Sequence, residues 1–257
     1  MSALRDELEQ LVSRYNSPEF IELDPISIPH RFGRKEDVEI SGFLAATIAW
    51  GNRKSIINNA NRMMHLLDNA PFDFIQNHEV KDLRRLEPFV HRTFNGTDFQ
   101  FFVSRLKNLY KESNGLEGIL TSGFQEYGTV KQAISHFHET FFQTEHLSRT
   151  RKHVSNPAKG SAAKRLNMYL RWMVRADDAG VDFGIWHGIP MSALSIPLDV
   201  HTGNVARELG LLTRKQNDWK AVEELDSQLR LFDERDPVKY DFALFGMGVS
   251  RRGRSLS

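Results

Sequence analysis

Apolar residues recur at three- and four-residue intervals along most of the chain, the spacing typical of amphipathic helices. Alternating apolar and polar runs joined by hairpin dipeptides, which would indicate strands, do not occur. The segments with helical spacing are 38–51, 53–68, 97–113, 129–142, 161–175, 200–209 and 218–233. The pattern therefore predicts an all-α fold.

The size and composition of the chain are those of a globular protein. Its 257 residues can bury a sizeable core, and one domain or two closely packed lobes both fit this length. No apolar run approaches the roughly 18 residues that cross a bilayer. The amphipathic segment 1–16 carries both signs of charge, unlike a signal peptide. We therefore expect a cytoplasmic protein with no membrane partner.

The residue types exclude several chemistries. The chain has no cysteine, which excludes disulfides, thiolate zinc sites, a cysteine nucleophile and a cysteine-ligated iron–sulfur cluster. His136 and His138 are two residues apart, so a helix would point their rings about 200° away from each other. No glycine-rich phosphate loop is present. We expect neither a metal site nor a cofactor.

Positive charge is concentrated in one segment, although the net charge of the chain is only +1. Residues 149–176 contain eight Lys or Arg residues and no Asp or Glu. Such a segment would attract a polyanion such as nucleic acid. A basic helix face exposed to solvent is the alternative interpretation.

Two helices of the predicted fold begin at a polar residue that could carry chemistry. Pro157 and Gly160 indicate a tight turn, and Lys164 falls in the first turn of the helix that follows. Pro197 favours an extended approach to Asp199, which occupies the predicted N-cap of the next helix. Lys164 and Asp199 are 35 positions apart, which is enough for one helix to end and the chain to return, so the two side chains could face each other across a groove. Each also has a purely structural interpretation, as a solvated lysine and as a helix cap.

These segments resemble parts of the helix-hairpin-helix DNA glycosylases, and most closely the 8-oxoguanine DNA glycosylase branch. "IPLDVHTGNVARELG" is similar to its catalytic-aspartate segment, and "GSAAKRLNMYLRWM" to its hairpin and lysine helix, with a spacing nearer that of the archaeal enzymes. Residues 45–63 and 239–246 resemble two further segments, in the expected order. The whole chain also resembles a conserved bacterial family with no assigned activity.

The resemblance implies a fold and a function. The fold would be an all-α, two-lobed arrangement with a cleft between the lobes, in which residues 1–257 form one catalytic unit and residues 150–210 the hairpin and catalytic segment. The activity would be that of a DNA N-glycosylase and AP lyase that excises a damaged purine such as 8-oxoguanine from double-stranded DNA in base excision repair. A non-catalytic nucleic-acid-binding protein with a glycosylase-like cleft is the alternative.

The resemblance also assigns roles to individual residues. Asp199 would stabilise positive charge on the sugar in the transition state, and Lys164 would attack the anomeric carbon to form a Schiff base. The base pocket would consist of Phe245 stacked on the extruded base, Asp241 at its Watson–Crick edge and Met168 below it. Phe245 could equally be part of the core.

The remaining candidates would hold the DNA. They are Gly160 and Ser161 at the start of the lysine helix, Arg165, His201, and the group Trp50, Asn52 and Arg53, which would fill the gap left by the base or read the orphaned partner. A simple turn at Gly160 and a buried Trp50 are the alternatives. Ala162 occupies the place of the second hairpin glycine, and Asp241 the place of a glutamine in the eukaryotic pocket, so the chain departs from the family pattern at two positions.

Overall fold

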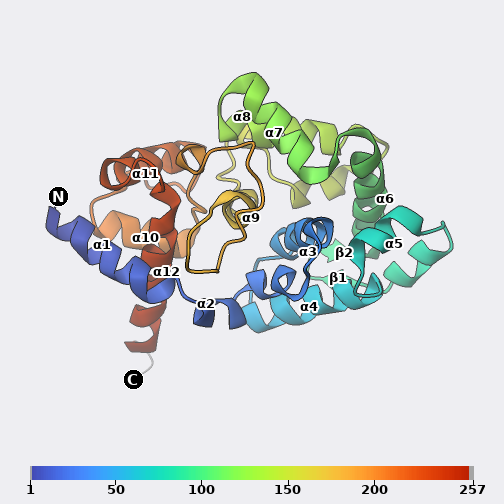
Figure 1. The fold of residues 1–257 in the computed structure, drawn as a ribbon, viewed down its shortest axis with the longest axis horizontal. Coiled ribbons are helices and arrows are strands. Elements are labelled where there is room, and N and C mark those ends of the chain that lie inside the picture. Colours follow the sequence, from blue (N-terminus) through green and yellow to red (C-terminus); the bar gives the residue numbers. More distant parts are fainter. Residues whose placement is uncertain (1, 255–257) are drawn as a thin grey trace. The chain divides into compact units, whose positions relative to one another are not determined.

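The computed structural model describes residues 2–254, and these form an all-α protein (Figure 1). The fold class predicted from the sequence is thereby confirmed. The chain divides into two compact units. The terminal unit combines the segment up to Glu22 with the segment from Asn156 onward, and the central unit comprises Leu23–Ser155. Among the described residues, no helix combines the length and the apolar character that crossing a bilayer would require.

The central unit consists of six α-helices, short 3₁₀ turns and one small hairpin. The hairpin pairs β1 (Val90–His91) with β2 (Phe94–Asn95) in antiparallel register. The helices are α3 (Lys35–Thr47), α4 (Arg53–Leu66), α5 (Pro71–Asn77), α6 (Gly96–Glu112), α7 (Gly115–Tyr127) and α8 (Val130–Phe141). The strands are two residues long, which is too short for an alternating sequence pattern to show.

Aromatic rings form much of the core of the central unit. Phe43 stacks on Phe102 with ring centroids 5.8 Å apart, and Phe102 meets Phe141 edge to face at 4.9 Å. All three rings are buried. A buried Phe side chain contributes about 1.5–3 kcal/mol through removal of its surface from water. The hydrophobic effect is therefore the main source of stability in this unit.

Helix α7 has no counterpart among the helices predicted from the sequence. It contains Gly115, Gly118 and Gly123, and glycine lowers helix propensity by about 1 kcal/mol per residue. The structure explains two of them by close packing. A Cβ on Gly118 would lie 1.9 Å from the Ser113 carbonyl oxygen, and one on Gly123 would lie 3.1 Å from the His136 side chain. A local contact with Ser113 accounts for Gly118, and a tertiary contact with His136 on α8 accounts for Gly123.

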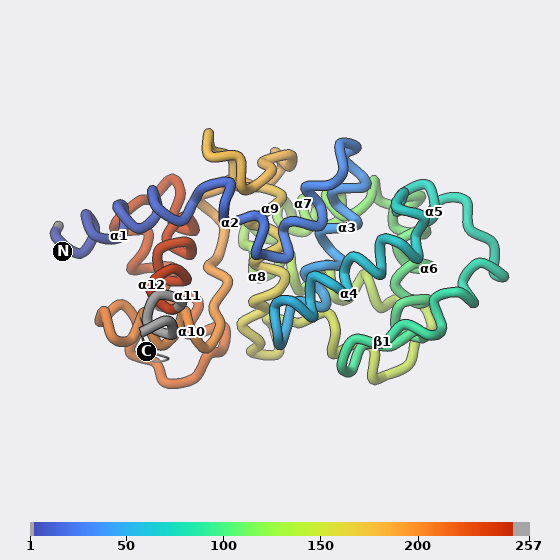
Figure 2. The backbone as a smooth tube through the Cα atoms, turned by 90° about the horizontal axis from the view of Figure 1, so that it is seen from below, coloured from blue at the N-terminus to red at the C-terminus, as the bar shows by residue number. Residues whose placement is uncertain are grey.

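The terminal unit is assembled from both ends of the described chain. Its helices are α1 (Ser2–Tyr15), α2 (Pro18–Glu22), α9 (Lys164–Val174), α10 (Val200–Glu208), α11 (Trp219–Phe232) and α12 (Tyr240–Arg254). Both α1 and α10 pack against α12 (Figure 2). Gly246 permits the first of these contacts, because a Cβ there would lie 2.1 Å from ring atoms of Tyr15. Helix α12 is thus the central packing element of this unit.

Candidate functional site

The turn before α9 places Lys164 at the first position of that helix. Gly160 has φ +87°, and Ala163, the residue directly before Lys164, has φ +46°. The Ala163 amide donates to the Ser161 hydroxyl oxygen at 3.2 Å, which helps to hold this shape. A residue with a Cβ in the left-handed region is unfavourable by about 1–2 kcal/mol. Strained backbone of this kind is concentrated at functional sites, so the strain at Ala163 favours a role for its neighbour.

Lys164 lies beside a buried methionine on the same face of α9. Its Nζ is 3.6 Å from Met168 Sδ, one turn further along the helix, and Met168 is 7% exposed. Lys164 itself is half-buried. The Lys164 amine therefore has an apolar surface on one side, and a place for Met168 below an extruded base stays a prediction.

Asp199 caps α10, as its position in the sequence predicts. Its Oδ1 accepts hydrogen bonds from the His201 and Thr202 amides at 2.8 and 2.9 Å. Both bonds use the same carboxylate oxygen, so capping requires only half of the group. The residues before it, 194–198, are buried, and the Ile196 amide is held by Asp226 at 2.9 Å. The cap therefore sits at the end of a well-anchored segment.

Asp241 lies in the first turn of α12, and the charges of both Lys164 and Asp199 influence the pKa of its carboxyl group. Burial raises the pKa of its carboxyl to about 6; the positive charge of Arg171 opposes the rise, the negative charge of Asp199 adds to it, and that of Lys164 opposes it. Lys164 and Asp199 thus both influence the pKa of one buried carboxyl group, although they come from different helix starts.

Asp241 is also one end of a buried ion-pair network. Its Oδ2 accepts from Arg171 Nη1, and Arg171 Nε donates to Asp182 at 3.2 Å. Arg175 Nη1 donates to the other oxygen of Asp182 at 3.0 Å, and its Nε donates to Asp236. Burying charge is unfavourable unless the charges are paired in this way. One oxygen of the Asp241 carboxyl therefore already has a buried partner, Arg171. The predicted contact of Asp241 with a base stays a prediction.

The basic segment 149–176 is therefore not a uniform cationic surface. Four of its side chains form ion pairs with carboxylates, namely Arg149, Arg151, Arg171 and Arg175. Arg171 and Arg175 are 2% exposed. The sequence interpretation counted them as cations available to a polyanion, which is wrong for these two. Their spacing could have shown this, because Lys164, Met168, Arg171 and Arg175 share one helical face.

Phe245 belongs to a small aromatic group in the terminal unit. It is half-buried, and its ring meets Phe20 edge to face at 5.7 Å. Phe20 makes a second edge contact, at 5.1 Å, with Phe242. The core interpretation thus has direct support, and stacking of Phe245 on a base stays a prediction.

The candidates for phosphate contact surround the two helix starts. Gly160 and His201 are exposed, and Ser161 and Arg165 are half-buried. The Gly160 carbonyl accepts from the Trp219 amide at 3.0 Å, so this turn is tied to α11. Burial lowers the pKa of Arg165 to about 10, which still leaves it positively charged at pH 7. A phosphate contact at these residues stays a prediction.

Trp50, Asn52 and Arg53 belong to the central unit. Asn52 caps α4 by accepting from the Ser55 amide at 3.1 Å, and Arg53 is the first residue of that helix. Trp50 is half-buried and stacks on His153 with ring centroids 6.0 Å apart. These residues thus have local structural roles. Their predicted contact with DNA stays a prediction.

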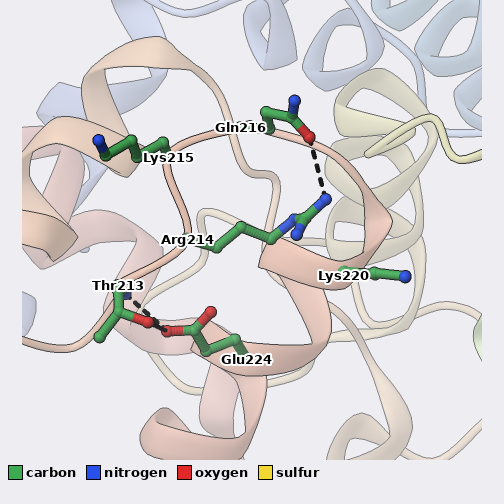
Figure 3. A pocket seen from close by; sticks show the side chains of 6 residues that line it. All are labelled: Thr213, Arg214, Lys215, Gln216, Lys220 and Glu224. Atoms are coloured by element: carbon green, nitrogen blue, oxygen red, sulfur yellow. Dashed lines mark hydrogen bonds between the residues drawn. The ribbon is translucent and has the colours of Figure 1, made fainter.

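A polar cavity of about 570 Å³ lies elsewhere in the terminal unit (Figure 3). It is formed by the segment before α11 and by α11 itself. The lining residues are Thr213, Arg214, Lys215, Gln216, Lys220 and Glu224. Lys164 and Asp199 do not line it. Within residues 2–254, no cluster of three or more His, Asp or Glu side chains has the arrangement of a metal site.

Comparison with known proteins places the chain in a family. No curated protein and no solved structure matches it. One family model, described as a protein of unknown function (DUF2400), matches residues 24–250. The match includes Lys164, Asp199 and Asp241 and extends over most of the chain. The chain therefore belongs to the DUF2400 family.

Proposed function

We propose that the protein is a DNA N-glycosylase with AP lyase activity that excises a damaged purine from double-stranded DNA. One observation carries the proposal: Lys164 and Asp199 begin two different helices of the terminal unit, and residues 217–219 bond to both helix starts, through the carbonyl oxygens of Gly160 and Asp199. An amine and a carboxylate at two connected helix starts are the groups that this reaction needs.

Each group has a defined chemical task. As the bond between the base and the sugar breaks, positive charge develops on the sugar, and the Asp199 carboxylate stabilises it. The lone pair of Lys164 Nζ attacks the anomeric carbon, and the base leaves with the electrons of the broken bond. After loss of a proton from the nitrogen and opening of the sugar ring, a Schiff base remains. A base removes a proton from C2′ of this intermediate, a C2′–C3′ double bond forms, and the 3′ phosphate leaves with the electrons of the broken C3′–O bond, which cleaves the strand.

Asp241 would take part in the base pocket in its protonated form. With a pKa of about 6, its protonated form makes up roughly a tenth of the molecules at pH 7. A protonated carboxyl can donate a hydrogen bond, which an aspartate in place of a glutamine would have to do at a base edge. The raised pKa therefore supports a place for Asp241 in the pocket despite its bond to Arg171.

Borohydride trapping tests the proposal. Two duplexes are used, one that contains 8-oxoguanine and one that contains an abasic site. Each is incubated with the protein and sodium borohydride, which reduces a Schiff base to a stable adduct. We expect wild-type protein to form the adduct and Lys164→Gln to form none. Lys220→Gln is the matched control, because Lys220 is an exposed lysine in the first turn of α11.

Two outcomes would overturn the proposal. One is an adduct that persists in Lys164→Gln at the wild-type level. The other is wild-type protein that neither forms an adduct nor releases a base from any member of a panel of purine lesions. Salt-sensitive binding to DNA in that second case would support the alternative function, a nucleic-acid-binding protein without turnover.

One observation favours that alternative. Asp199 caps α10 and Asp241 pairs with Arg171, so both carboxylates have structural roles that do not require catalysis. Trapping distinguishes the two functions because only the enzyme forms a covalent bond.

A further inference from the structure

The segment between α10 and α11 contacts the starts of both α9 and α10. Asn217 Nδ2 donates to the carbonyl oxygen of Asp199 at 3.0 Å. Two residues later, the Trp219 amide donates to the Gly160 carbonyl at 3.0 Å, and Asp218 forms a β-bridge with Ser161. Residues 217–219 are thus bonded to the turn that precedes Lys164 and to the backbone of Asp199.

Arg207, on α10, fixes this segment in place. Its Nε donates to the Arg214 carbonyl at 2.8 Å, and its Nη2 donates to the Lys215 carbonyl at 3.0 Å and to Asn217 Oδ1 at 2.6 Å. The Asn217 amide therefore accepts from Arg207 through its oxygen and donates to Asp199 through its nitrogen. Because both ends of the amide are engaged, its orientation is determined.

The space for this arrangement exists because residue 203 is a glycine. A Cβ on Gly203 would lie 2.8 Å from Asn217 Oδ1 and 2.9 Å from Arg207 Nη1. Gly203 is inside a regular helix, where glycine is unfavourable relative to alanine by about 1 kcal/mol. Close approach of the Asn217 amide accounts for the glycine.

We propose that Asn217 is a positioning residue, which sets the place of the Asp199 carboxylate relative to Lys164 through the Asp199 carbonyl. This inference rests on the proposed glycosylase function. Asn217 acts only through the backbone of Asp199 and through the bonded residues 217–219, and it contacts no reacting atom. An error of about 1 Å in the place of a catalytic group can lower a rate about 100-fold.

Asn217→Asp is the main test variant. It keeps the size of the side chain and an oxygen for Arg207, but it has no N–H for the Asp199 carbonyl. Asn204→Asp is the matched control, since Asn204 is exposed on α10 and undergoes the same change of charge. Gly203→Ala is a second variant, which displaces the Asn217 amide without any change of charge.

Single-turnover base release gives the first readout. We expect Asn217→Asp and Gly203→Ala to release base about tenfold more slowly than wild type, because a displacement of the Asp199 carboxylate by less than about 1 Å should lower the rate by less than about 100-fold. Their affinity for the lesion duplex should stay within about twofold of wild type, because the lost contact acts on the reaction step and not on binding. A loss that appears only as weaker binding would overturn the inference.

Amide hydrogen exchange gives a readout that needs no activity. The His201 and Thr202 amides donate to Asp199 Oδ1, so a displaced Asp199 should let them exchange faster in Asn217→Asp than in Asn204→Asp. Unchanged exchange together with unchanged base release overturns the role of Asn217, while an adduct with wild-type protein still supports the glycosylase. Faster exchange, together with wild-type protein that neither forms an adduct nor releases a base, supports the contact of Asn217 with Asp199 and overturns the glycosylase.

Discussion

Asp98 and Asp241 are buried aspartates in the first turn of a helix, one in each unit, and their surroundings move the carboxyl pKa in opposite directions. Burial would raise the pKa of Asp98, but hydrogen bonds from His153, Thr150 and the Asn95 backbone outweigh it and lower the value to about 2. At Asp241 burial dominates, and the pKa rises to about 6. Burial alone therefore does not determine how a carboxyl titrates.

The difference lies in the charged and polar groups around each carboxyl. Asp98 closes the capping box of α6 and also receives Arg149 at 2.8 Å and Thr150 at 2.7 Å. Each of these partners stabilises the ionised form. Asp241 has Arg171 as a partner but also the negative charge of Asp199 nearby. Carboxyl groups with raised pKa values beside a second carboxylate are typical of functional sites.

The largest effect is expected for Asp199→Asn. Asparagine is as good an N-cap as aspartate, so α10 should remain intact. Loss of the charge should lower single-turnover base release by about 100- to 1,000-fold, the range found when one electrostatic partner of a transition state is removed. The control is Asp98→Asn, which should release base at the wild-type rate for each folded molecule. Base release by Asp199→Asn within threefold of the wild-type rate would contradict the role assigned here. A tenfold change in rate corresponds to about 1.4 kcal/mol of transition-state stabilisation, so a threefold change would leave almost none to the carboxylate charge.

The next effect concerns stability. Asp98→Asn should lower the free energy of unfolding by about 3 kcal/mol, because it removes one partner of a buried charge cluster. Asp73→Asn is the comparison, since Asp73 pairs with Arg34 on the surface and such pairs contribute about 0–1 kcal/mol. Urea denaturation of both variants measures the difference. Equal losses would show that the Asp98 cluster contributes no more than a surface pair.

The two carboxyl groups should also respond to acid in opposite ways. Asp241 has a folded-state pKa above the unfolded value, so it takes up a proton and favours the fold as pH falls from about 6 to about 4. The gain is on the order of 2 kcal/mol, and Asp241→Asn should remove it. Asp98 has a depressed pKa, so its contribution is complete above about 4 and is lost as pH falls toward 2.

Urea denaturation of wild type and Asp241→Asn at pH 7, 5 and 4 measures this contribution. The unfolding free energy of wild type minus that of Asp241→Asn should increase as the pH falls. A difference that is the same at all three values would show that Asp241 titrates as it does in the unfolded chain.

The smallest effect compares two turns of equal geometry. Gly160 and Gly128 have φ +87° and +78°, and a Cβ on either would meet no atom within 4 Å. Alanine at either position should therefore lower the free energy of unfolding by about 1–2 kcal/mol through backbone strain alone. Only Gly160→Ala should also slow base release, because that turn precedes Lys164. If both variants slowed base release equally, the turn at Gly160 would have no special role in placing Lys164.

Local signals in the sequence predicted part of the site. The cap at Asp199 and the turn at Gly160 depend on residues adjacent in the chain, and both are confirmed. The partner of Asp241 could not be predicted in this way, because Arg171 lies 70 residues earlier and the pair forms only when α9 and α12 come together. Helix α7 was missed because its glycines weaken the local helical signal, and the contact of Gly123 with His136 forms only when α7 and α8 come together.

The contact between α1 and α12 has a consequence for synthesis. Tyr15 and Gly246 pack against each other although more than 200 residues separate them, whereas Leu23–Ser155 is continuous. During translation the continuous unit can fold as soon as it leaves the ribosome, while α1 must wait for α12. A chain that terminates early would therefore carry a finished central unit and an unpaired amphipathic helix at its beginning, and the residues around Lys164 would lack the support of α12.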